Sequence, residues 1–263
     1  MQIDPASNEI SNAFTIDGYP ESAVQSNDRV WVGVEGSILE LDAQTGSSLA
    51  QIPGPGGYLA STPGRIWALA SRDVLKSVDT STAAVASTVD LGLSASDSVS
   101  GGPFASGDAV WVIASHSSDS DVGSGSLIRI DPSSSAVTTR VDLPRAVSVV
   151  AVSAEAVWVT DNSGENASLT RIDGLTGETS EPVNLDGQWT PFAVGGDRVW
   201  LMGNYGDGSY EIGGFNADVG SIDVRVSVTG TPAYDGSAIF DGTSSAIWIS
   251  ENGGGVTRID LSE

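Results

Sequence analysis

Short runs of apolar residues recur along the chain, and six of them are centred on a tryptophan with an aliphatic residue on either side. These tryptophans are Trp31, Trp67, Trp111, Trp158, Trp200 and Trp248. Successive members are 36 to 48 residues apart. Apolar strands that return with a period in the forties are typical of propeller blades, each of which is one small antiparallel sheet. The hydrophobic pattern therefore predicts an all-β fold made of repeats.

A polar turn follows each tryptophan run and marks the same period. Residues 41–46 read Leu-Asp-Ala-Gln-Thr-Gly, and residues 172–177 read Ile-Asp-Gly-Leu-Thr-Gly. An Asp or Asn opens such a turn because its side chain accepts hydrogen bonds from backbone amides further on, and Gly closes it where φ is positive. The marker occurs seven times, from residues 3–8 to residues 259–261. Seven markers enclose six intervals, which predicts a six-bladed β-propeller with four antiparallel strands per blade.

The two ends of the chain share one repeat. Residues 1–263 then form a single propeller domain, and the last blade lacks a fourth strand after Asp260. Residues 10–16 have the apolar character needed to supply it, which would close the ring and cover the open sheet edges. Residues 1–4 and 258–260 compete for the third strand of that blade. We favour the C-terminal copy because it directly follows its own tryptophan strand.

Composition excludes several classes of function. The net charge is −23, with one lysine and ten arginines, so nucleic acid and anionic membrane surfaces are not expected partners. The chain has no cysteine, which excludes disulfides and thiolate metal sites. No apolar run approaches the roughly 18–20 residues that span a bilayer. The acidity favours a soluble monomer. The composition is typical of a high-GC bacterium, with a halophile as the alternative.

Two segments carry a resemblance to known propellers. Residues 126–132 read Ser-Leu-Ile-Arg-Ile-Asp-Pro, and residues 168–173 read Ser-Leu-Thr-Arg-Ile-Asp. With the Val-Trp-Val strands before them, they resemble bacterial propeller repeats of the streptogramin (virginiamycin B) lyase, YVTN and NHL kinds. The resemblance implies a propeller. Streptogramin lyases cleave a cyclic peptide with histidines and a magnesium ion, whereas this chain has only His116. NHL-type propellers also occur as extracellular sensor domains, and this role stays open.

The loops between the second and third strands of the blades vary most, and such loops on a rigid scaffold are where function concentrates. Trp189 is the one tryptophan outside the repeat, and it precedes the fifth blade on the face that bears Asn204, Tyr205 and Asp207. These groups suit a sugar ring or a peptide side chain. The alternative is that Trp189 plugs the channel mouth or caps the blade. His116 opens the loop of the third blade and is placed across the same rim.

Other residues are weaker candidates. Asp119 and Asp121 alternate as the oxygen ligands of a calcium loop do, but without a downstream Glu, and a solvated acidic loop is the alternative. No other cofactor is expected. A further set should face the central channel from the starts of the first strands, and most of its members are small or neutral: Glu21, Gly57, Gly102, Ser148, Thr190 and Ala238. They predict a narrow channel and not a charged catalytic centre.

Known catalytic templates are absent from the sequence, which has no His-Glu-x-x-His, Gly-x-Ser-x-Gly, Walker or dinucleotide fingerprint. A Ser–His–Asp set would depend on His116 alone. The chain opens inside a repeat, so we expect a targeting segment outside this sequence and a location outside the cytoplasm. The prediction is a non-catalytic binding or sensor module for a protein, peptide or glycan. The alternative is an enzyme of the streptogramin-lyase-like or glycan-cleaving kind.

Overall fold

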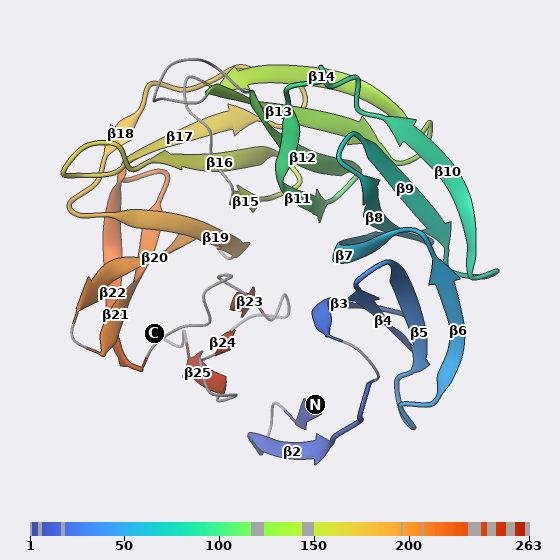
Figure 1. The fold of residues 1–263 in the computed structure, drawn as a ribbon. Coiled ribbons are helices and arrows are strands. Elements are labelled where there is room, and N and C mark those ends of the chain that lie inside the picture. Colours follow the sequence, from blue (N-terminus) through green and yellow to red (C-terminus); the bar gives the residue numbers. More distant parts are fainter. Residues whose placement is uncertain are drawn as a thin grey trace. The chain divides into compact units, whose positions relative to one another are not determined.

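A computed structural model describes residues 2–4, 7–16, 19–116, 124–143, 150–195, 197–206, 208–230, 238–240, 246–250 and 256–260. All regular elements among these residues are strands, β1 to β25, and none is a helix (Figure 1). The described part of the chain therefore has no helix of the length and apolarity needed to cross a membrane. The chain divides into two compact units, the first with residues 1–119 and 126–142, the second with residues 120–125 and 143–263.

The first unit holds a hairpin and three four-stranded antiparallel sheets. The hairpin pairs β1 (Gln2–Asp4) with β2 (Glu9–Asn12). The first sheet has β3 (Pro20–Ser26), β4 (Arg29–Val34), β5 (Ser37–Asp42) and β6 (Ser48–Pro53). The second has β7 (Gly56–Thr62), β8 (Arg65–Ser71), β9 (Val74–Asp79) and β10 (Ala84–Asp90). The third has β11 (Ser98–Ser106), β12 (Ala109–His116), β13 (Ser124–Asp131) and β14 (Ala136–Leu143).

The second unit repeats the same plan. One sheet has β15 (Ala151–Val152), β16 (Ala156–Asp161), β17 (Ser168–Asp173) and β18 (Val183–Asn184). The next has β19 (Trp189–Gly195), β20 (Arg198–Gly206), β21 (Ser209–Asn216) and β22 (Ser221–Thr229). A three-stranded sheet has β23 (Ala238–Phe240), β24 (Ala246–Ser250) and β25 (Val256–Asp260). Since β25 pairs with β24, the C-terminal copy occupies the third strand of its own sheet, as favoured above.

Consecutive strands are neighbours in every sheet, with the earliest strand at one edge and the latest at the other. Repeated four-stranded antiparallel sheets of this order are those of a β-propeller. The predicted all-β propeller class is therefore confirmed. Six blades, a single domain and closure of the ring by residues 10–16 depend on how the two units meet, and they stay predictions.

Repeat tryptophans fill the space between successive sheets of each unit. Trp31 packs with Leu59 and Ile66 of the following sheet, and Trp158 packs with Val199 and Leu201 of its following sheet. The tryptophans of the first five repeats are buried, whereas Trp248 is half-buried. Burial of a large apolar ring is worth a few kcal/mol, which makes these indoles the main packing elements between sheets. The repeat tryptophans therefore have a structural role within each unit.

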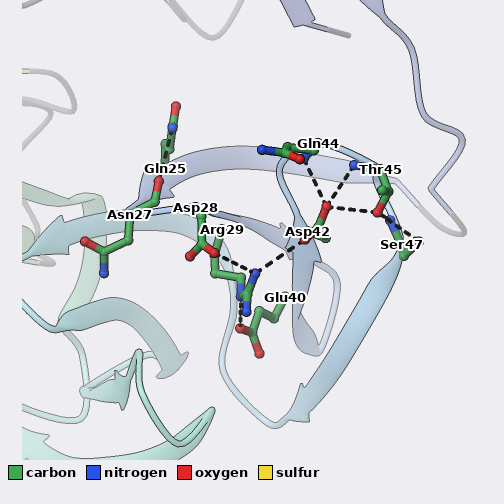
Figure 2. Close-up of polar contacts among 9 residues, drawn as sticks. All are labelled: Gln25, Asn27, Asp28, Arg29, Glu40, Asp42, Gln44, Thr45 and Ser47. Carbon is green, nitrogen blue, oxygen red and sulfur yellow. Dashed lines mark hydrogen bonds and ion pairs between the residues drawn. The ribbon is translucent and has the colours of Figure 1, made fainter.

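Polar turns close the outer hairpins as predicted. The carboxylate of Asp42 accepts hydrogen bonds from the amides of Gln44 and Thr45 at 3.1 and 2.8 Å (Figure 2). Equivalent hydrogen bonds from the amides of Thr176 and Leu175 and from the Thr176 hydroxyl lower the pKa of Asp173. The hydroxyl and amide of Ser133 lower the pKa of Asp131 further, to about 2. These hydrogen bonds hold the turns and stabilise the ionised form of each carboxylate, which is why its pKa is lowered.

Every repeat carries one arginine at either of two positions that share a sheet face with the repeat tryptophan. Three repeats place it at the first residue of the second strand, as Arg29, Arg65 and Arg198. The other three have alanine there and place arginine on the third strand, as Arg129, Arg171 and Arg258. Arg129 and Arg258 lie over their tryptophan rings at 6.0 and 5.4 Å from the ring centroids. Each repeat therefore has one arginine on this face, supplied by its second or its third strand.

Arg29 shows what this cation does. Its Nε donates to Glu40 Oε1 at 3.1 Å, and its Nη1 donates to Asp28 and Asp42 at 3.2 and 3.4 Å (Figure 2). Glu40 is buried, so without the guanidinium its charge would be costly. The arginine thus joins the two hairpin turns at this end of the sheet and neutralises a buried carboxylate.

Candidate functional site

Four first strands contain a β-bulge close to their beginning. The register shifts between Pro20 and Ser22 in β3, between Gly56 and Leu59 in β7, between Gly101 and Phe104 in β11, and between Pro191 and Ala193 in β19. A bulge turns side chains out of the regular alternation and is common beside functional sites. Three residues expected from the sequence to face the channel, Glu21, Gly57 and Gly102, lie within these bulges. The strand starts are therefore the first place to look for a site.

The bulge of β7 is held by the neighbouring sheet. Gly57 and Tyr58 stand between Gly56 and Leu59, whose partners Leu69 and Ala68 are consecutive on β8. The hydroxyl of Ser22, on the adjacent strand β3, donates to the carbonyl oxygen of Gly57 at 3.0 Å and accepts from the amide of Leu59 at 2.8 Å. One hydroxyl thus binds the backbone on both sides of Tyr58. The backbone at this tyrosine is therefore held by β3 as well as by its own sheet.

Glycines allow the close approach that this arrangement needs. A Cβ at Gly33 of β4 would lie 1.8 Å from the carbonyl oxygen of Gly57, and a Cβ at Gly56 would lie 2.3 Å from that of Val34. Gly57 itself has φ of 75°, which favours glycine. The start of β7 is therefore packed directly onto β4 and the turn that follows it.

Four exposed residues lie on the segments that adjoin here, and we call them the Tyr58 rim: Tyr19, Glu21, Glu35 and Tyr58. Tyr58 is 51% exposed and Tyr19 is 89% exposed, which is unusual for aromatic rings. Glu21 lies so close that a Cβ at Gly57 would meet its Oε2 at 3.3 Å. Tyr19 and Glu35 directly flank the paired residues Pro20 and Val34. The rim therefore combines two exposed tyrosines and two exposed glutamates on adjoining segments of the first unit.

Such a surface offers aromatic rings and negative charge to a ligand. Exposed tyrosines offer an apolar face with a hydroxyl at its end, and carboxylates offer acceptors for amides, hydroxyls or cations. Among the described residues, no group of three or more His, Cys, Asp or Glu side chains is arranged to hold a metal ion.

His116 lies at the end of β12 and contacts Asp97, which directly precedes β11. Its Nδ1 is 3.1 Å from Oδ2 of Asp97. Asp97 directly precedes Ser98 and His116 directly follows Ser115, and these two serines are paired. The Ser94 hydrogen bonds and the contact with His116 hold the pKa of the Asp97 carboxyl below its ordinary value. The histidine is half-buried and partnered, so its ring is oriented by the carboxylate.

Trp189 corrects one expectation from the sequence. The residue is fully buried, and its Nε1 donates to the carbonyl oxygen of Asp186 at 2.6 Å. The Arg225 guanidinium lies 5.1 Å from the ring centroid, and the Asn162 amide bonds both the N–H and the C=O of Trp189. A ring without exposed surface presents nothing to a ligand. The expectation that Trp189 contacts a ligand directly therefore gives way to the alternative, in which Trp189 has a structural role at the start of β19.

The remaining predicted site residues are only partly visible. Asn204 and Tyr205 belong to strand β20, but the orientation of their side chains lies outside what the structure describes. Asp207, Asp119 and Asp121 lie outside the described residues, so the calcium loop stays a prediction. His116 belongs to the first unit and Trp189 to the second, so their common rim also stays a prediction.

The sequence did not single out Tyr19 and Tyr58. A signal was present, since Gly56 and Gly57 directly precede Tyr58, and paired glycines in a strand indicate a bulge or a close backbone approach. The sequence did single out Glu21 and Gly57, as residues expected to face the channel, and both lie next to or within the rim. The aromatic residue beside them was missed because its exposure depends on the neighbouring sheet.

No protein-family model matches the chain, and no curated protein matches it in sequence. The fold resembles solved propellers. Hydrazine synthase of Kuenenia stuttgartiensis superimposes with a TM-score of 0.66 at 14% identity, over 95% of this chain and 79% of that one. BamB of Moraxella catarrhalis superimposes with a TM-score of 0.58 at 18% identity, over 90% of this chain and 68% of that one. A chain of a Mitotic Checkpoint Complex superimposes with a TM-score of 0.66 at 14% identity, over 99% of this chain and 81% of that one. Identities this low show the fold alone.

Proposed function

We propose that this chain is a non-catalytic binding or sensor module that works outside the cytoplasm and holds a protein, peptide or glycan on the Tyr58 rim. The observation that carries the proposal is the exposed ring of Tyr58 on a backbone that Ser22 fixes from the neighbouring sheet. An exposed aromatic ring on a fixed backbone loses little conformational entropy on binding, and such rings are typical of binding surfaces. The acidic surface keeps such a module soluble and monomeric.

One structural neighbour supports a protein partner in particular. The chain of the Mitotic Checkpoint Complex belongs, by that description, to an assembly. Propellers of similar shape also host enzymes, as the hydrazine synthase structure illustrates by its name. The choice between these classes therefore rests on the residues of this chain and not on its neighbours.

The proposal is tested with glycan and peptide arrays probed by three proteins: the wild type, Tyr58→Ser and Val85→Ser. Val85 is an exposed apolar residue on the outer strand β10 of the same sheet, so its substitution removes exposed apolar surface far from the rim. We expect one class of ligand to be retained by wild type and Val85→Ser and lost by Tyr58→Ser. Ligands that bind all three proteins equally would contradict a site at the rim.

An enzyme is the second candidate, favoured by the pair of Asp97 and His116. A carboxylate 3.1 Å from Nδ1 orients an imidazole as in a general base. Turnover of an array hit that disappears with both His116→Ala and Asp97→Asn, while binding persists, would favour this candidate over the binding module.

A further inference from the structure

We infer that the Tyr58 rim takes a cationic segment of a protein, with a lysine or arginine side chain lying against Tyr58 and its charge facing Glu21 and Glu35. This inference rests on the proposed function and specifies its ligand. A cation near the face of an aromatic ring is attracted by the ring quadrupole, and a nearby carboxylate adds a direct ion pair.

The geometry supplies both elements at one place. Glu21 Oε2 lies within 3.3 Å of the Cβ position of Gly57, the residue before Tyr58. Glu35 lies in the turn after β4. Gly56 packs so closely on this turn that an added Cβ would lie 2.9 Å from the amide nitrogen of Ser37. Two exposed carboxylates therefore belong to segments that adjoin the backbone of Tyr58, which Ser22 holds in place. Ordering the site on binding costs little.

The charge of the chain favours the same ligand. The sequence has 34 acidic residues against 11 lysines and arginines. Several of the arginines are engaged within the protein with acidic side chains, hydroxyls or carbonyl oxygens: Arg29, Arg65, Arg72, Arg129, Arg140, Arg171, Arg198, Arg225 and Arg258. Lys76 approaches the linker at Gly54, with Nζ 3.8 Å from the Cβ position there.

A neutral glycan would also stack on tyrosine, but it has no charge to match the two carboxylates. Burial of Glu21 and Glu35 under an uncharged ligand would cost desolvation without an ion pair in return. The same cost is offset when the ligand brings an ammonium or a guanidinium. The charges at the rim therefore favour a cationic protein segment over a glycan.

The experiment uses fluorescein-labelled Gly-Ser peptides that carry three lysines, three arginines or three glutamates, with binding followed by fluorescence anisotropy. We expect the lysine and arginine peptides to bind and the glutamate peptide not to bind. Tyr58→Ser should weaken binding on the order of tenfold at unchanged net charge, and Tyr58→Phe should keep it. Circular dichroism and the melting temperature check that each variant is folded.

Matched charge variants separate the rim from the acidic surface as a whole. Glu21→Gln and Asp142→Asn each remove one exposed carboxylate of the first unit, but Asp142 lies on the outer strand β14. We expect a severalfold loss of affinity for Glu21→Gln and less than a twofold change for Asp142→Asn. Equal losses in these two variants, with Tyr58→Ser binding as wild type does, would overturn the inference.

The failures of the two proposals are distinguishable. If the array ligands that require Tyr58 are neutral glycans and the cationic peptides do not bind, the cationic ligand is wrong and the binding module stands. If no ligand on the array or among the peptides depends on Tyr58, both proposals are wrong.

Discussion

Ser22 and Gly57 are joined by a hydrogen bond between two sheets, in which the Ser22 hydroxyl donates to the Gly57 carbonyl oxygen at 3.0 Å. The same hydroxyl accepts from Leu59 at 2.8 Å, so it bridges the bulge that carries Tyr58. β3 and β7 are the first strands of successive sheets and lie side by side in the first unit (Figure 1). The contact thus joins the two sheets and holds the backbone on both sides of Tyr58.

Ser22→Ala should uncouple this bulge. The Gly57 carbonyl and the Leu59 amide would each lose a partner, which costs about 1–3 kcal/mol of unfolding free energy in urea denaturation. Any ligand that depends on Tyr58 should also bind more weakly. Ser22→Thr keeps the hydroxyl and is the control. If Ser22→Ala matched the wild type in both stability and binding, the bridge would have no role.

Trp189→Ala should act on stability and not on binding. The buried indole leaves a cavity, and its Asp186 hydrogen bond is lost, so we expect a cost of roughly 3–5 kcal/mol. Trp189→Phe should cost less because it keeps an aromatic ring. The measurement is thermal unfolding together with array binding of the folded fraction. A nearly unchanged melting temperature with abolished binding would restore the role expected from the sequence.

Arg29→Ala should destabilise the first sheet more than Glu40→Ser. The first change leaves a buried carboxylate without its main partner, at about 1–3 kcal/mol. The second removes the buried charge and copies the following sheet, where Arg65 donates to Ser77 at 2.8 Å. Urea denaturation of both variants gives the order. The reverse order would mean that Glu40 stabilises the sheet independently of the arginine.

The two arginine positions should be interchangeable in the second unit. A Cβ at Gly214 would lie 2.8 Å from Cδ of Arg198, so Gly214→Arg alone should be strongly destabilising. Arg198→Ala removes the nearest of the atoms that this Cβ would meet, with Cζ3 of Trp200 remaining at 3.0 Å, and gives the arrangement found in the repeats of Arg171 and Arg258. The double variant should therefore be more stable than Gly214→Arg in thermal unfolding. Additive losses would show that the sites do not share one space.

Asp131 predicts a pH dependence of stability. Its pKa is lowered from 3.8 to about 2 in the folded protein, chiefly by the Ser133 hydroxyl and amide. A carboxyl with a depressed folded pKa stabilises the protein above its unfolded pKa, and this stabilisation is lost as the pH falls through the folded pKa. The advantage of wild type over Asp131→Asn should thus be constant above pH 3.8 and vanish as the pH falls toward about 2.

Asparagine is a fair control for that experiment because Asn216 opens the equivalent turn of the second unit, where its oxygen accepts from the amides of Asp218 and Val219. The comparison uses urea denaturation across the acid range. An advantage that persists unchanged to the lowest pH would mean that the charge of Asp131 is not its source.

The sequence by itself determined the elements that depend on neighbours along the chain. The turn at Asp42 closes through amides two and three residues further on, and Gly46 supplies the positive φ. The repeat of Trp31 and its counterparts determined which strands are buried, because apolar surface must be covered in any arrangement. Strands, turns and the propeller class could therefore be predicted.

Tertiary structure alone decided which side chains are available for binding. Trp189 is covered by Arg225 and packs against Gly213, whereas Tyr58 is exposed on a backbone that Ser22, a residue of the preceding sheet, holds in place. All of these contacts join segments that are far apart in the sequence. Exposure is a property of the packed chain, since it depends on what other segments cover, and residue type and spacing do not specify that covering.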